Sequence, residues 1–184
     1  MFRWLGMVLC CLLYPTVAIV AAQPLDRKPA SSNQVGAAMA MLATLEDARV
    51  LPPEGTPQAN RVIKIVIQFQ SAFMKSRDPV IRNFFRQALY NTFGEGRGAE
   101  IEEAFRKTGW TSSVLEALER YRLSASTREL DALRPGLTEF NLTMSDFDYL
   151  AQLFHDASLE YHQRGLDIHQ IFANRRAEMP GGKS

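Results

Sequence analysis

The three histidines of this chain are the residues whose type and spacing most invite a chemical role. His155, His162 and His169 follow one another at intervals of seven residues. On a continuous helix, this spacing places them on one line, about 10.5 Å apart. Because metal–nitrogen bonds are only about 2.0–2.1 Å long, one metal ion cannot bind two of them. No strong ligand lies one turn away from any of the three, so we expect neither a metal ion nor a cofactor.

Two roles for the histidines are compatible with the sequence. In the first, they border the core or a seam between helices and hydrogen-bond to water or to acids. In the second, they form a surface that gains positive charge below a pH of about 6.5. No nucleophile-elbow pattern and no Glu-x-x-His motif accompanies them. His155, His162 and His169 are thus the candidate binding residues of the sequence, and no catalytic residue is predicted.

The helix that would carry the histidines is predicted to run from Thr143 to about Met179. Thr143 or Ser145 can cap its start, and apolar residues recur through it at steps of three and four. Pro180-Gly181-Gly182 ends this helix. We predict that residues 180–184 form a disordered tail.

The stretch Thr56–Met74 is predicted to be the central helix of the fold. A helix with so narrow a polar stripe should be covered on most of its circumference. Thr56-Pro57, a cap followed by a first-turn proline, favours a helix over the alternative of a β-strand at Val62–Phe69. From Arg61 onward, its polar residues other than Gln70 fall on one line at Arg61, Lys64, Gln68, Ser71 and Lys75.

Start and stop signals predict further helices on both sides of this stretch. The first, roughly Gln34–Arg49, carries Val35, Met39 and Leu42 near one face, while Gly36 and several alanines make it thin. Others are predicted at Asp78-Pro79 onward, at 99–108, from Thr111 or Ser112, and from Ser126 or Thr127 up to Pro135-Gly136. Gly94–Gly98 lacks the strand and the Lys-Ser/Thr pair of a phosphate-binding loop, so we interpret it as a flexible connector.

The phenylalanines of these helices could line a ligand cavity or fill a core. Native packing density favours a filled core. The residues concerned are Phe69, Phe73, Phe84, Phe85, Phe93 and Phe105.

The N-terminus has the pattern of an export signal. Arg3 precedes the uncharged apolar run from Trp4 to Tyr14, and small residues lead up to Ala22. This pattern predicts a signal peptide at residues 1–22, cleaved before Gln23, and a flexible lead at 23–33. The alternative is an uncleaved segment that anchors the protein in a membrane. Cys10 and Cys11, the only cysteines, lie inside the signal, so disulfides and thiolate chemistry are excluded from the mature chain.

Composition limits the partners of the protein. The chain of 184 residues has 21 Lys and Arg against 20 Asp and Glu, without blocks of one sign. Mixed charges of this kind give no electrostatic footprint for nucleic acid. After cleavage, no stable membrane span is expected.

Together these features predict an all-α protein. We expect a single-domain bundle of six or seven helices over residues 34–179, with a central, largely buried helix and a long C-terminal helix. The predicted function is that of a periplasmic or secreted, non-enzymatic binding or accessory module for a protein partner or an apolar ligand. The alternative is an exported hydrolase or metal-dependent protein that uses the C-terminal histidines.

Overall fold

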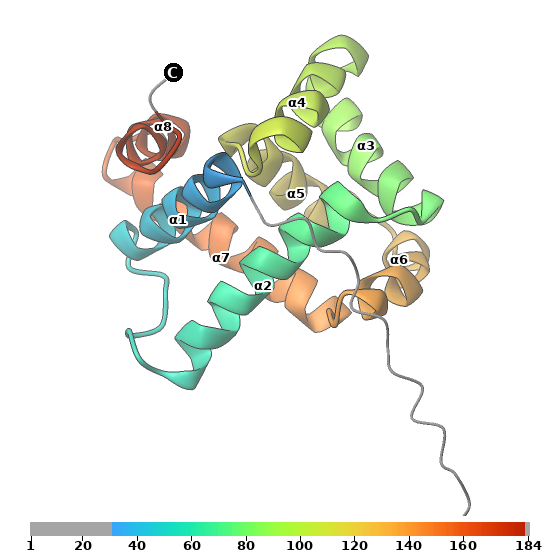
Figure 1. Cartoon of the computed structure of the whole chain (residues 1–184), viewed down its shortest axis with the longest axis horizontal. Coiled ribbons are helices and arrows are strands. Elements are labelled where there is room, and N and C mark those ends of the chain that lie inside the picture. The colour runs from blue at the N-terminus through green and yellow to red at the C-terminus, as the bar shows by residue number, and fades with distance from the viewer. Residues whose placement is uncertain (1–30, 183–184) are drawn as a thin grey trace, which may run out of the picture.

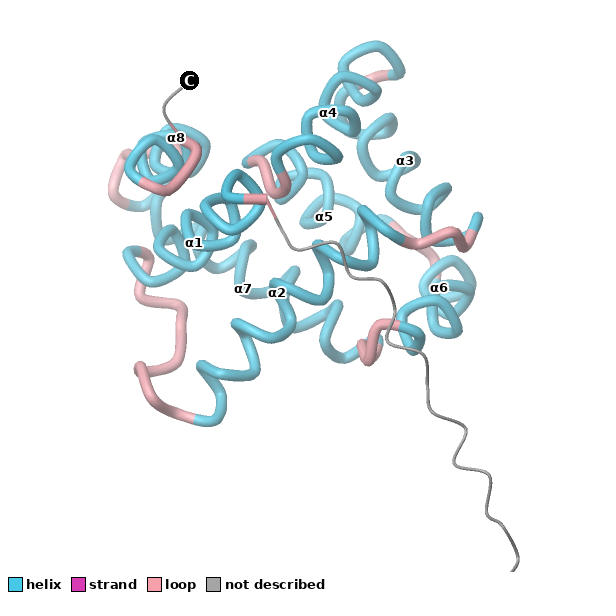
Figure 2. Tube along the Cα trace, in the orientation of Figure 1, coloured by secondary structure: helices cyan, strands magenta, loops and turns pink. Residues whose placement is uncertain are grey.

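Residues 31–182 form eight α-helices and no strand in a computed structural model (Figures 1 and 2). The predicted all-α bundle is therefore confirmed, with a helix count slightly above six or seven. The predicted signal peptide lies outside the described residues, as does most of the predicted lead. The helices are α1 (Ser32–Asp47), α2 (Pro57–Lys75), α3 (Pro79–Phe93), α4 (Glu95–Thr108), α5 (Ser112–Ser124), α6 (Thr127–Glu139), α7 (Met144–Gln163) and α8 (Ile168–Glu178).

The predicted helix starts at Thr56-Pro57 and Asp78-Pro79 are confirmed by their caps. The Thr56 hydroxyl accepts a hydrogen bond from the backbone N–H of Ala59 at 3.2 Å, and Pro57 follows in the first turn of α2. The Asp78 carboxylate accepts from the N–H of Val80 at 2.8 Å in the same way at the start of α3. Each cap satisfies an N–H group that has no partner inside the helix.

Aromatic rings fill the core between the helices. The Phe73 and Phe85 rings stack with centroids 4.8 Å apart, Phe85 lies 4.9 Å from Phe105, and Phe105 lies 5.5 Å from Trp110. All four residues are buried. The expected filled core is thus present, and of the six phenylalanines only Phe93 is partly exposed.

Helix α2 is less completely covered than the sequence predicted. One face of it is buried against the bundle through Val62, Ile65, Phe69 and other apolar residues. Figure 1 shows α2 crossing one face of the bundle, with α1, α3 and α7 against it. Ile63 and Ile67 remain 42% and 52% exposed, because none of the helices in residues 31–182 covers that side of α2.

The predicted single helix from Thr143 to Met179 is wrong, since the chain turns after Gln163. Gly165 adopts a positive φ of 69°, and its N–H bonds to the carbonyl of His162 while the N–H of Leu166 bonds to that of Tyr161. This is a Schellman C-cap, which glycine permits at low cost. Asp167 then caps α8 by accepting from the N–H of His169 at 3.0 Å. The C-terminal part of the bundle is therefore two helices.

Two other segments are also more regular than predicted. Gly94–Gly98 is not a flexible connector, because α4 begins at Glu95. A Cβ on Gly98 would lie 2.4 Å from the Tyr90 ring, so this glycine allows α4 to pack closely on α3. Helix α6 continues through Pro135 to Glu139.

The part of the predicted disordered tail that the structure describes, residues 180–182, is held by hydrogen bonds at Pro180 and Gly181. The Arg176 guanidinium donates to the carbonyl oxygens of Pro180 and Gly181, at 3.1 and 3.3 Å. The same side chain donates to the carbonyl of Asn33 at 3.1 Å. Residues 180 and 181 therefore lie against the start of α1.

Candidate functional site

An open apolar groove of about 310 Å³ lies between α1 and α2. Both helices contribute mainly aliphatic and thioether side chains to its walls. From Ile63 to Lys75, the α2 wall is about 18 Å long at 1.5 Å per residue. The lining residues are Gln34, Val35, Ala38, Met39, Leu42, Ile63, Ile67, Gln70, Ser71, Met74 and Lys75.

Exposed apolar side chains gather in this groove. Of the eight large hydrophobic residues that are exposed in the described part of the chain, four line it. Val35 and Met39 of α1 are each 45% exposed, and they accompany the exposed Ile63 and Ile67 of α2. Single exposed hydrophobics are ordinary, whereas a gathered set marks an interaction site.

Helix α1 places apolar residues on both of its faces. Its core face begins with the small residues Gly36, Ala37 and Ala40 and continues with Met41 and Leu45, and all five are buried. Small residues let the helix backbone approach its neighbours closely. The apolar face predicted from the sequence, with Val35 and Met39, is the face that lines the groove.

Polar groups mark one end of the groove. The Gln34 side-chain amide lies 3.7 Å from the Met74 sulfur and joins the start of α1 to the end of α2 there. Lys75 and Ser71 line the same end. Gln70 also borders the groove and is only 8% exposed.

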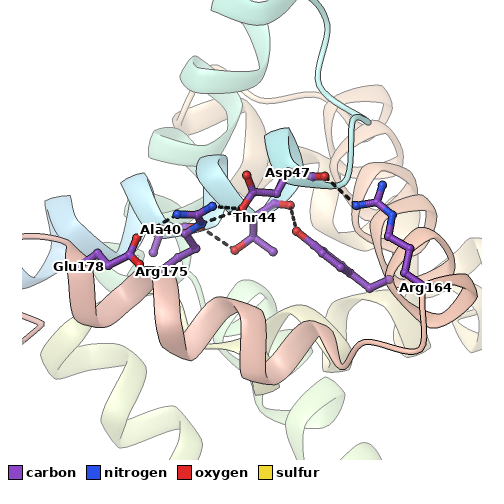
Figure 3. A network of polar contacts seen from close by, with 7 residues as sticks. Ala40, Thr44, Asp47, Arg164, Arg175 and Glu178 are labelled. Atoms are coloured by element: carbon purple, nitrogen blue, oxygen red, sulfur yellow. Dashed lines mark hydrogen bonds and ion pairs between the residues drawn. The ribbon is translucent and has the colours of Figure 1, made fainter.

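A polar network anchors α1, the outer wall of the groove, to the C-terminal helices (Figure 3). The Arg175 guanidinium of α8 donates to the Asp47 carboxylate at 2.6 Å. Arg164 donates to the backbone carbonyl of Asp47 at 3.0 Å. Since Arg176 holds the other end of α1 at Asn33, α1 is fixed at both ends.

The three predicted site residues do not share one line, because the break before α8 separates them. His155 of α7 lies with its Nδ1 2.8 Å from Glu119 Oε1, and His169 of α8 with its Nε2 3.2 Å from Glu116 Oε2. Both glutamates belong to α5. His162 is exposed. Two of the histidines thus connect helices through acids, and their role in binding stays a prediction.

A second, smaller cavity of about 40 Å³ lies beside the histidine–glutamate pairs. Ser112, Ser158 and His169 line it together with Glu116 and Glu119. Within residues 31–182, no three His, Cys, Asp or Glu side chains come together as metal ligands. We therefore interpret the pairs as braces from α5 to α7 and α8.

Comparisons with protein-family models, with curated proteins and with solved structures each found no match for this chain. Among the described residues, no helix combines the length and the apolar character needed to cross a bilayer.

Proposed function

We propose that this chain is a non-enzymatic binding module that holds an apolar ligand in the groove between α1 and α2. The observation that supports this most directly is the gathering of Val35, Met39, Ile63 and Ile67 in one concave site while the remaining core is filled. Ligand sites of small molecules are concave, mostly apolar and completed by a few polar groups. The groove has all three features.

An apolar chain fits this groove better than a flat protein surface does. The groove runs between two helices and is joined at one end by the contact between Gln34 and Met74. A flexible hydrocarbon chain can follow such a shape along its length. Covering the exposed half of one aliphatic side chain is worth about 1 kcal/mol, so each wall residue should contribute a measurable share of the affinity.

The experiment that tests this function uses the neutral fluorophore N-phenyl-1-naphthylamine as the ligand. We expect saturable binding to the purified protein and a dissociation constant that rises about fivefold in Ile67→Gln, the equivalent of about 1 kcal/mol. Leu159→Gln is the matched control, because Leu159 is an aliphatic residue of α7 with 47% exposure that does not line the groove. It should leave the dissociation constant unchanged.

A second variant tests the shape of the site. Ala38→Phe adds a ring to the wall of the groove and should abolish binding of the fluorophore while far-UV circular dichroism stays that of the parent protein. An absence of binding to the parent, or equal losses in Ile67→Gln and Leu159→Gln, would reject the groove as the site.

We also propose that the protein works outside the cytoplasm. Arg3, the apolar run from Trp4 to Tyr14 and the small residues up to Ala22 support this. Expression of the full chain in a bacterium, followed by fractionation and intact-mass measurement, tests it. The expected product is periplasmic or secreted and starts at Gln23; a full-length product in the cytoplasmic or membrane fraction would contradict the proposal.

A further inference from the structure

Resting on the proposed binding function, the polar end of the groove points to the chemistry of the ligand. We propose that the groove selects an acyl chain with a negatively charged carboxylate head, as in a fatty acid. The chain lies along the aliphatic walls, and the carboxylate lies at the end marked by Lys75 and Gln70.

The charges around the groove favour an anion. Among the described residues that line it, Lys75 is the only charged one, and none is Asp or Glu. The ion pairs found within the described chain do not involve Lys75. Its ammonium group is therefore available for a carboxylate, and one positive charge matches the single negative charge of a fatty acid.

A largely buried glutamine also lines the groove. Gln70 is 8% exposed and makes no side-chain hydrogen bond with any other residue of the described chain. Its amide atoms are not among the fully buried side-chain groups without a partner, so they reach the groove and can bond to a ligand oxygen there. The Gln70 amide can donate N–H groups to a carboxylate beside the Lys75 ammonium.

Gly109, in the turn after α4, leaves space for the Gln70 side chain. A Cβ on Gly109 would lie 2.6 Å from Gln70 Nε2, and Gly109 has a positive φ of 88°. Only glycine combines this backbone conformation with the absence of a side chain at low cost. The close contact keeps the Gln70 side chain at the floor of the groove, beside α1.

The ends of the two helices offset one another at this end of the groove. The first turn of α1, with Gln34, carries a partial positive charge, and the last turn of α2, with Lys75, carries a partial negative one. The preference for an anion therefore rests on the Lys75 ammonium group and the Gln70 amide.

The experiment compares three ligands with the same twelve-carbon chain by isothermal titration calorimetry of the full-length or signal-free protein at pH 8 and low salt. Dodecanoate carries a negative head, dodecan-1-ol a neutral one and dodecyltrimethylammonium a positive one. Because one exposed ion pair contributes up to about 1 kcal/mol, dodecanoate should bind about fivefold more tightly than dodecan-1-ol. The cation should bind most weakly, and added salt should reduce these differences.

Two lysine variants distinguish the contribution of the ligand's carboxylate to the affinity from that of its hydrocarbon chain. Lys75→Gln should remove the preference for dodecanoate while the affinity for dodecan-1-ol stays unchanged. Lys64→Gln is the matched control, since Lys64 is an exposed lysine of the same helix outside the groove, and it should keep the preference. Gln70→Met, which keeps the length of the side chain, should also lower the preference.

Each other outcome has a definite meaning. Equal binding of dodecanoate and dodecan-1-ol by the parent protein would overturn the carboxylate head and leave the groove function standing. Equal weakening of both ligands in Lys75→Gln would also overturn it, because the lysine would then act on the chain. If none of the three ligands binds, both proposals fall.

Discussion

The hydroxyl of Tyr161 donates a 2.7 Å hydrogen bond to the backbone carbonyl of Thr44 and so joins the end of α7 to the last turn of α1. Both residues are buried. Burial, with a smaller contribution from Asp47, raises the pKa of Tyr161, which keeps the hydroxyl protonated and able to donate. Helix α1, which forms one wall of the groove, is therefore held in place in part by a hydrogen bond from α7.

Removing this hydrogen bond should lower stability. Tyr161→Phe leaves the ring in place, and the Thr44 carbonyl retains its backbone bond from Ala48, so we expect a loss of about 1 kcal/mol in the free energy of unfolding. Urea denaturation measures it. Tyr149→Phe is the control, because the Tyr149 ring packs under Arg61 and its hydroxyl bonds to no described residue. Equal stability of the Tyr161 variant and the parent would contradict the expectation.

Two glycines inside helices should respond to alanine in opposite directions. A Cβ on Gly136 of α6 would lie 2.4 Å from Asp78 Oδ2 and 2.7 Å from Ile81 Cδ1, so Gly136→Ala should cost about 1–3 kcal/mol through overpacking. Gly96 of α4 has nothing within 4 Å of that position. Gly96→Ala should raise stability by up to about 1 kcal/mol. Thermal unfolding of both variants checks the two signs; a shift in the same direction would refute the packing argument.

The Glu102 carboxylate should make the stability depend on pH in the acidic range. Glu102 is 6% exposed and accepts from Arg106 at 2.7 Å and from Arg86 at 3.2 Å. Burial alone would raise its pKa, but the two arginines outweigh burial, and the pKa of Glu102 is lowered. A carboxyl with a lowered pKa stabilises the fold fully above its unfolded pKa of about 4.3, and this stabilisation is lost as pH falls through the folded value.

The variant Glu102→Gln isolates that contribution. It should be about 2 kcal/mol less stable than the parent at pH 7, since hydrogen bonds to a charged group are lost. The difference should shrink as the pH falls below about 4. Glu103→Gln is the control, because the pair of Glu103 with Lys107 is exposed on both sides and such pairs contribute little. A difference that stays constant from pH 7 to pH 3 would contradict the assignment. Denaturant unfolding at a series of pH values provides the measurement.

The sequence predicted those helix starts that are marked by local chemistry. Thr56-Pro57 and Asp78-Pro79 cap and begin their helices as expected, because a cap and its N–H partner lie within three residues. The break at Gly165 was missed, since apolar residues keep their helical spacing across it. A glycine within such a pattern can lie inside a continuous helix or end it. Here the packing of α8 on α1 favours the ending of α7 at this glycine.

The groove was not predicted from the sequence. The narrow polar stripe of Thr56–Met74 predicted a helix covered on most of its circumference, whereas Ile63 and Ile67 remain exposed and form one wall of the groove. The histidines attracted attention through their regular spacing, which the turn before α8 removes. Which apolar face of α1 meets the core depends on the size of its residues and on the partners that approach it, and spacing alone does not encode that.

The contact between Gln70 and Gly109 gives the protein an optical reporter. Trp110 directly follows Gly109, is 1% exposed and has no hydrogen-bond partner for its indole N–H among the described residues. The other tryptophan, Trp4, lies within the proposed signal peptide. In the processed chain, tryptophan emission would therefore come from one shielded indole, placed one residue beyond the floor of the groove. Its wavelength and intensity would register occupancy of that floor without an attached dye.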